Sequence, residues 1–320
     1  MIHFNGENNI QEVHYNGRDI RTVYDHLGKV WEKRPPDYPN EYLTVRVLDG
    51  NSEAMINFVS NSGCTVDLKY SLNGGSWTTY TQPISGLQEA DVVRFKGHVV
   101  QQTDAGPYGK YGSFSFNYRN VEVEGNVMSL LYEDNFSGQT DLMYPWIFSG
   151  MFSLSLSLIG LLNAENLILP ATALTDCCYS NMFYNCAVLQ TAPQLPATTL
   201  ADSCYYQMFA KCGVLQTAPT LPATTLADNC YVGMFNGCKA LETAPELPAT
   251  TLAYASYLRM FANCDNLNYI KCMASDISAT SCTTQWLDGV AANGTFVTPS
   301  STTWSSGIDG IPQNWTRVDL

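Results

Sequence analysis

A 26-residue step runs through the second half of this 320-residue chain. Four prolines mark the step: Pro170, Pro196, Pro222 and Pro248. Methionine, phenylalanine and leucine positions keep the same spacing. The copies that begin at Leu195 and Leu221 share the pattern LPATTLADxCYxxMFxxCxxLxTAP, and the copies at Leu169 and Leu247 follow it less closely. A copy of this length cannot bury its own apolar face, so consecutive copies are expected to stack and share one core. Residues 141–270 are therefore predicted to form one repeat domain.

The period and the leucines indicate the kind of repeat. A period in the twenties with recurring leucines is typical of leucine-rich repeats. Residues 189–193 end at a proline and are predicted to be a short parallel strand. Cys204, Met208, Phe209 and Cys212 follow the spacing i, i+4, i+5, i+8, which favours a helical stripe. The prediction is an α/β leucine-rich-repeat solenoid.

Eleven cysteines raise the question of a metal site or disulfides. Most of them follow the repeat in two rows: Cys178, Cys204 and Cys230, and Cys186, Cys212, Cys238 and Cys264. The spacing between the rows is not that of zinc ligands, and Ser256 takes the place of a fourth cysteine in the first row. The thiols are therefore interpreted as small buried core residues, and no metal or cofactor is predicted. So many unpaired thiols fit synthesis in a reducing cytoplasm.

Two β segments precede the repeats. Residues 1–36 contain an Asn16-Gly17 hairpin signal and are predicted to be a small β-meander. This segment is too short for a core of its own, so it is expected to dock on a partner or to pack as a capping sheet. Residues 41–132 contain several short strand patterns and predict a β-sandwich that is immunoglobulin-like in the loose sense.

The C-terminal segment, residues 271–320, loses the repeat and is predicted to cap the last copy. Trp286, Trp304 and Trp315 suit that role because they are large and apolar. The predicted fold is thus multidomain: mainly β, with an N-terminal β-meander, a β-sandwich and a C-terminal α/β solenoid with its cap.

The charge and the apolar pattern exclude several classes of partner. The net charge is −13, with 16 basic against 29 acidic residues, so no nucleic-acid partner is expected. Polar residues interrupt the most apolar stretch, residues 147–169, and no membrane insertion is expected. The first residues lack a basic and then apolar leader pattern, so no secretory signal is expected.

The sequence contains no recognisable catalytic motif. None of the four histidines lies in the repeats, and GxSxG, P-loop and GxGxxG patterns are absent. Cys64 and Cys282 stand outside the cysteine rows without a histidine nearby in sequence. Carboxylate pairs of glycosidases can be far apart in sequence, which leaves that class open. The expectation is a protein that is not an enzyme and has no catalytic residue.

Positions that differ between the copies are the candidate binding surface. Beside the predicted strand they are Gln190, Gln194, Gln216, Thr220, Glu242, Glu246 and Asn268. Beside the predicted helical stripe they are Gln207, Lys211 and Arg259. Tyr179 and its equivalents 26, 52 and 78 residues later do not vary, and packing between copies is preferred to an exposed aromatic row for sugars.

The MFxxCxxL and LPATTL blocks resemble the BspA-like leucine-rich-repeat family, which is common in Bacteroidetes surface proteins and their phages. The order of the parts, and tail motifs such as YIKCMASDIS and GIPQNWT, resemble phage and prophage proteins of Bacteroides and its relatives. The resemblance implies a virion appendage of head-fibre or tail-fibre type, made in the host cytoplasm. Its partners would be other virion proteins and a host-surface glycan or protein. It would assemble as a small homo-oligomer such as a trimer.

The docking prediction and the alternatives complete the hypothesis. The N-terminal residues expected to contact the virion are Tyr15, Arg18, Arg21, Tyr24 and Trp31. A bacterial cell-surface adhesin of the BspA type is the main alternative, against which the missing signal counts. A carbohydrate-active enzyme is the other alternative, against which the missing catalytic motif counts.

Overall fold

A computed structural model describes the protein over residues 14–15, 18–19, 22–25, 28–32, 38–48, 53–60, 64–102, 111–117, 120–153 and 160–320. The chain divides into two compact units, Met1–Asp37 and Tyr38–Leu320. The β segment after residue 38 and the repeat copies belong to the same unit and share one hydrophobic core.

The first unit contains two short antiparallel strand pairs. β1 (His14–Tyr15) pairs with β2 (Arg18–Asp19), on either side of the predicted Asn-Gly turn. β3 (Thr22–Asp25) pairs with β4 (Gly28–Glu32). β2 thus returns on β1, and β3 begins a second pair with β4.

Two sheets form the β segment of the second unit. Their strands are β5 (Leu43–Val47), β6 (Ala54–Ser60), β7 (Cys64–Leu72), β8 (Thr78–Thr79), β9 (Ile84–Leu87), β10 (Val92–Gln102), β11 (Gly112–Asn117), β12 (Val121–Asn126), β13 (Leu161–Asn163) and β14 (Leu167–Ile168). The larger sheet has the order β13-β12-β5-β10-β7-β8, with β14 also on β12, and the smaller has the order β11-β6-β9. The rings of Phe95 and Phe114 join the two sheets, with centroids 5.0 Å apart. Alternate buried residues along β5 and β11 point into this core.

A short helical connection lies against the larger sheet after β12. It consists of α1 (Ser129–Tyr132) and the 3-10 turn η2 (Glu133–Asn135), and another 3-10 turn, η1 (Tyr38–Asn40), precedes β5. The buried Ser129 hydroxyl accepts the Leu43 N–H at 2.9 Å and donates to the Phe95 carbonyl at 3.0 Å. These two bonds fix α1 to β5 and β10.

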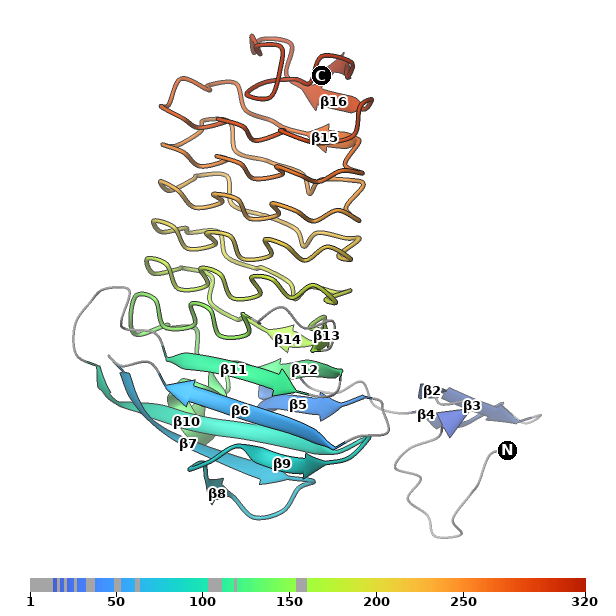
Figure 1. The fold of residues 1–320 in the computed structure, drawn as a ribbon, viewed down its shortest axis with the longest axis vertical. Helices are drawn as coiled ribbons and strands as arrows, with labels where there is room; N and C mark the ends of the chain where they lie inside the picture. The colour runs from blue at the N-terminus through green and yellow to red at the C-terminus, as the bar shows by residue number, and fades with distance from the viewer. Residues whose placement is uncertain are drawn as a thin grey trace. The chain divides into compact units, whose positions relative to one another are not determined.

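The predicted α/β leucine-rich-repeat solenoid is wrong. Among the described residues α1 is the one α-helix, and it lies outside the repeats, so the fold is mainly β. The segment predicted as a helical stripe is a succession of turns. The Met208 N–H donates to Tyr205 of its own copy at 3.1 Å, whereas the next N–H, of Phe209, donates to Met234 of the following copy at 2.9 Å. Figure 1 shows the resulting coils stacked one above another, from yellow-green to orange.

Left-handed backbone at every fourth residue is the physical reason why no helix forms. Gln207 and Lys211 have φ values of 51° and 65°, and Gly233 and Gly237 have 56° and 78° at the equivalent positions. A turn whose third residue has positive φ is a type II turn, and an α-helix cannot contain such residues. Apolar side chains four residues apart therefore face the core through repeated turns rather than through helical periodicity.

Exchanging residues at these turn positions tests the backbone argument. We expect Gly237→Ala to lower the free energy of unfolding by about 0.5–1 kcal/mol, because an L-residue at positive φ costs about 1–2 kcal/mol and a less flexible unfolded chain returns part of it. The added Cβ would make only ordinary contacts, at 3.7 Å from Lys211. Lys211→Gly is expected to change stability in the opposite direction. Urea unfolding measures both, and equal signs would contradict the turn assignment.

Aromatic ladders fill the interior of the coils. Tyr179, Tyr205, Tyr231 and Tyr257 are buried, with neighbouring ring centroids 5.9–6.1 Å apart. A phenylalanine row, Phe152, Phe183, Phe209, Phe235 and Phe261, runs beside it with centroids 5.3–5.7 Å apart. Packing between copies is thus confirmed as the role of the tyrosine row, and the sugar-stacking alternative for it is excluded.

The cysteine rows are buried, as predicted from the sequence. The Cys212 thiol donates to the Phe183 carbonyl at 3.2 Å, and Cys186, Cys238 and Cys264 make the same bond in their copies. Each thiol therefore ties its coil to the preceding one. Burial raises the pKa of Cys178, Cys212 and Cys238 well above its usual value, so these thiols stay protonated at neutral pH.

Tryptophans close the last coil. The Trp286 ring stacks on Tyr257 at 6.0 Å and on Trp304 at 5.4 Å. Three parallel strands complete this end: β15 (Tyr269–Lys271), β16 (Thr295–Thr298) and β17 (Thr316–Asp319). Trp286, Trp304 and Trp315 are all buried, which confirms their predicted capping role.

Candidate binding groove

Two adjoining hollows cross the coils at equivalent segments of three copies, which read QTAP at residues 190–193 and 216–219 and ETAP at residues 242–245. Their volumes are about 600 and 580 Å³, and both are lined by Gln216, Thr217 and Ala218. The lining extends from Glu165 to Asn266, so it draws on successive copies. We call the two hollows together the groove. It runs across the coils because its lining residues recur at the 26-residue step.

The lining is polar and carries no positive charge. Its longer polar side chains are Glu165, Gln190, Gln194, Gln216, Glu242 and Asn266. One threonine from each of three copies lies between them: Thr191, Thr217 and Thr243. Lysine, arginine and histidine are absent from the lining of both hollows. The groove therefore offers amide, hydroxyl and carboxylate groups, with two carboxylates as its only charges.

The backbone hydrogen-bond ladder between coils is open in the groove. At the two ends of the groove its lining residues take part in a closed ladder: Gln190 N–H donates to Leu162 at 2.8 Å, and Asn268 N–H donates to Glu242 at 2.9 Å. Over residues 216–218, in contrast, no backbone or side-chain hydrogen bond to another described residue is formed. Adjacent parallel strands normally pair these groups. Residues 216–218 form no strand, and their N–H and C=O groups have no hydrogen-bond partner among the described residues.

Four of the predicted binding residues line the groove: Gln190, Gln194, Gln216 and Glu242. Thr220, Glu246 and Asn268 are exposed but do not line it. Glu246 forms an ion pair with Lys271 at 2.9 Å. The threonines and alanines of the groove are not among the predicted binding residues, because they are constant between copies and belong to the predicted strand.

Gln207, Lys211 and Arg259 do not line the groove and occupy the positive-φ turn positions instead. The Lys211 ammonium lies 5.1 Å from the centroid of the Tyr184 ring, and Arg259 Nε donates to Gln285 at 2.7 Å. The variation at these positions includes two glycines, Gly233 and Gly237. Backbone conformation, which glycine and asparagine adopt at low cost, accounts for part of that variation.

The predicted docking residues fall in the first unit. Tyr15, Arg18, Tyr24 and Trp31 lie on β1, β2, β3 and β4, and the description of these strands is limited to their backbone. Arg21 lies outside the described residues. The docking prediction therefore stays a prediction.

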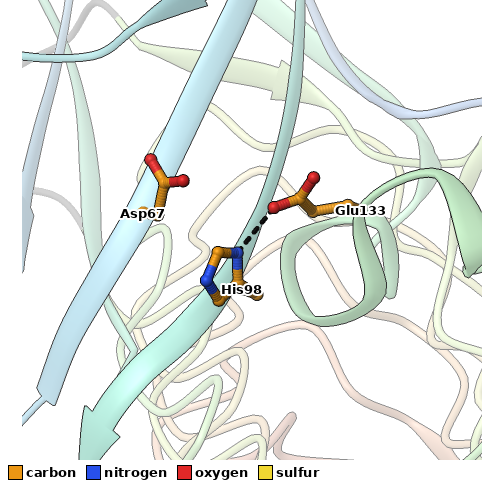
Figure 2. Close-up of side chains that lie close together, drawn as sticks. All are labelled: Asp67, His98 and Glu133. Carbon is orange, nitrogen blue, oxygen red and sulfur yellow. Dashed lines mark hydrogen bonds and ion pairs between the residues drawn. The ribbon is translucent and has the colours of Figure 1, made fainter.

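A second polar cluster, not predicted from the sequence, lies on the larger sheet. Asp67 of β7 and His98 of β10 are opposite each other in the strand register, and Glu133 reaches them from η2. Figure 2 shows the three side chains close together, with a dashed line between His98 and Glu133. His98 Nδ1 lies 2.6 Å from Glu133 Oε1. Their potential ligand atoms all lie within 4.8 Å of one another. One imidazole and two carboxylates are a donor set suited to a divalent transition metal.

Lys69 already supplies a cation to this cluster. Its ammonium lies 3.1 Å from Asp67 and 3.5 Å from Glu133. The hydrogen bond to Asp67 is the main reason why the pKa of Lys69 is raised, which keeps the ammonium charged. A metal ion would have to displace this ammonium. We therefore describe the cluster as an ion-pair network and assign no metal to it.

A neighbouring ion pair gives a pH-dependent prediction. The buried Lys96 ammonium lies 2.7 Å from Asp134, and this hydrogen bond, followed by that from Tyr42, lowers the pKa of Asp134. A lowered folded-state pKa stabilises the protein above the unfolded-state pKa, and this contribution is lost as the pH falls through the folded-state value. The Asp134 side chain is 57% exposed, so solvent screens part of this ion pair. We therefore expect Asp134→Asn to lower the unfolding free energy by only about 0.5 kcal/mol at pH 7 and by less at acid pH.

Urea unfolding at pH 7 and near pH 3 would measure this effect. The control is Asp265→Asn, because Asp265 and its partner Lys239 are both more than half exposed. An Asp134→Asn variant that loses the same stability at both pH values would contradict the prediction.

The groove is the candidate binding site, and all of its lining residues belong to the repeat region. Among these residues no helix is both long enough and apolar enough to cross a membrane. Comparisons with protein-family models, with curated proteins and with solved structures find no match for this chain.

Proposed function

We propose that this chain is a non-enzymatic virion appendage, of head-fibre or tail-fibre type, whose stacked coils bind the host surface. The observation that carries the binding role is the groove, because it crosses successive copies. Its lining combines residues that are constant between copies, such as Thr217, with residues that differ, such as Gln216 and Glu242. An extended polar hollow of this kind suits a ligand that is itself extended. The resemblance of the repeat blocks and tail motifs to Bacteroidetes phage proteins supports the virion location.

The separate first unit supports a chain in which one part attaches to the virion and another part binds the host. Met1–Asp37 is a compact unit distinct from Tyr38–Leu320, so attachment to a particle and recognition of a host can reside in different parts of the chain. In this proposal the first unit binds other virion proteins, and the chain assembles as a small homo-oligomer. The protein has no catalytic role and needs no cofactor.

Two measurements test the proposal. Mass spectrometry of phage particles, purified from cultures that produce this chain, is expected to detect it as a stoichiometric component. The isolated protein is expected to compete with those particles for adsorption to host cells. Absence of the chain from the particles would refute the virion location, and lack of competition would refute the binding role.

A matched pair of variants connects adsorption to the groove. Thr217→Arg places a long cationic side chain in the wall shared by both hollows and is expected to abolish competition. Thr224→Arg makes the same change at an exposed position of the repeat that does not line the groove. It is expected to compete as well as the unmodified protein. Equal competition by the two variants would move the binding site elsewhere.

A further inference from the structure

We infer that the groove binds an uncharged linear glycan that lies across the coils. This inference rests on the proposed host-binding function and specifies the chemical class of its ligand. The open backbone ladder at residues 216–218 is its starting point. These groups include both N–H donors and C=O acceptors, and the amides of Gln190 and Gln216 beside them also combine both. A sugar hydroxyl donates and accepts at once, so a row of hydroxyls matches such a lining.

The charge of the groove favours a neutral ligand. Glu165 and Glu242 are the charged residues of the lining, and no basic side chain faces them there. The whole chain carries a net charge of −13, so a polyanion such as a uronic-acid polymer or a phosphorylated polysaccharide is repelled. The other polar groups of the lining are amides, hydroxyls and backbone groups, which are uncharged. An uncharged polymer therefore fits this lining better than a charged one.

The periodicity of the groove favours a polymer over a single small molecule. Thr191, Thr217 and Thr243 are equivalent residues of successive copies, and each lines a hollow. A ligand with its own repeating unit can make the same contact at each coil, and the contacts then act together because they are linked. Affinity is expected to rise with ligand length until the groove is spanned.

The direction of the groove favours a glycan over a peptide strand. A peptide that completes an open β-ladder runs alongside the strand with which it pairs, in either direction. Here the unpaired backbone is limited to residues 216–218, whereas the lining runs across the coils from Glu165 to Asn266. A ligand along the groove therefore crosses the strands and meets side chains and short stretches of backbone from several copies. Linear glycans bind in this way without needing a backbone ladder.

Affinity electrophoresis and calorimetry with defined polysaccharides test the inference. The neutral probes are amylose, mannan, xylan and linear galactan with their short oligomers, alginate is the anionic probe, and extended peptides of mixed sequence are the third class. We expect at least one neutral polysaccharide to bind, with affinity rising with oligomer length, and alginate and the peptides not to bind. Binding of alginate or peptides alone, or of no neutral probe, would overturn the inference.

Conservative variants locate the binding. The double variant Gln216→Ala, Thr217→Val removes two polar side chains shared by the hollows and is expected to weaken binding about tenfold or more. Thr224→Val, outside the groove, is the control and is expected to bind normally, and thermal melts show that each variant is folded. Neutral-glycan binding that the double variant leaves unchanged would also overturn the inference.

The outcome is distinguishable from failure of the proposed function. A chain that is present on virions and competes for adsorption, but binds no neutral glycan, keeps the proposed function and loses the ligand class. Treatment of host cells with protease or with periodate then identifies the receptor as protein or as sugar.

Discussion

Phe209→Ala is expected to lower the free energy of unfolding of the second unit by about 3–5 kcal/mol, the usual cost of emptying a buried phenylalanine site. The Phe209 side chain is fully buried, and its ring stacks on Phe183 at 5.3 Å and on Phe235 at 5.7 Å. Its loss removes two aromatic contacts at once and leaves a cavity between coils. The neighbouring coils cannot close that cavity without breaking their own hydrogen bonds.

Urea unfolding followed by circular dichroism and by tryptophan fluorescence would measure this loss. Phe209→Leu is the graded variant and is expected to cost less, because it leaves a smaller cavity. Val214→Ala, at a side chain that is 42% exposed, is the control and is expected to change stability by less than about 0.5 kcal/mol. A loss for Phe209→Ala as small as that of the control would mean that the aromatic ladder does not hold the coils together.

The two optical probes are also expected to report one transition. The phenylalanine ladder does not stop at the repeats, because Phe152 stacks on Phe114 of β11 with centroids 6.0 Å apart. At the other end Tyr257 stacks on Trp286. The sheets, the coils and the cap thus share one continuous core, and units with a shared core unfold together.

The repeat alone was sufficient to predict which side chains are buried, but it led to the wrong backbone. Met208, Phe209 and Cys212 were predicted to face the core and do so. Their spacing of four and three residues is shared by an α-helix and by a chain of four-residue turns. A chain of such turns differs from an α-helix by its residues with positive φ. Glutamine and lysine, the residues at positions 207 and 211, do not by themselves predict a positive φ. The glycines at the equivalent positions of the next copy, Gly233 and Gly237, do indicate it, because glycine adopts positive φ at low cost.

The sequence predicts only part of the candidate site. Differences between copies identified Gln190, Gln216 and Glu242, because surface positions vary while core positions do not. Thr217 and Ala218 are identical in the neighbouring copies, so a comparison of the copies does not identify them as surface residues. Whether a backbone ladder is open depends on how far neighbouring coils separate, and no residue type encodes that separation by itself.

The Asp67–His98–Glu133 cluster depends on long-range register. Asp67 and His98 are opposite each other only because β7 and β10 pair in one register, with β8 and β9 between them in the chain. A shift of one residue would place the two side chains on opposite faces of the sheet. Glu133 joins them through α1, whose position depends on the buried hydroxyl of Ser129. Such a site follows from the fold and not from a sequence motif.

Gly125→Ala is expected to have the second large effect, because Gly125 lies where the larger sheet meets the first coil. It belongs to β12, which pairs with β5 on one side and with β13 and β14 on the other. Its φ is +79°, and an added Cβ would clash with the Tyr42 carbonyl oxygen. The left-handed backbone costs about 1–2 kcal/mol and the clash about 1–3 kcal/mol more. The expected loss of stability is therefore about 2–5 kcal/mol.

Gly138→Ala is the matched control for this prediction. Gly138 has nearly the same φ, +75°, but no atom lies within 4 Å of the position of its added Cβ. The control carries the cost of the backbone conformation alone, so the difference between the two variants in urea unfolding measures the close approach of Tyr42. Equal losses would mean that β5 and β12 separate at little cost, and the sheet would then not anchor the first coil. The other outcome is a larger loss of stability for Gly125→Ala than for Gly138→Ala, with the sheets and the coils unfolding in separate transitions. It would show that the pairing of β5 with β12 makes the sheets and the coils unfold together.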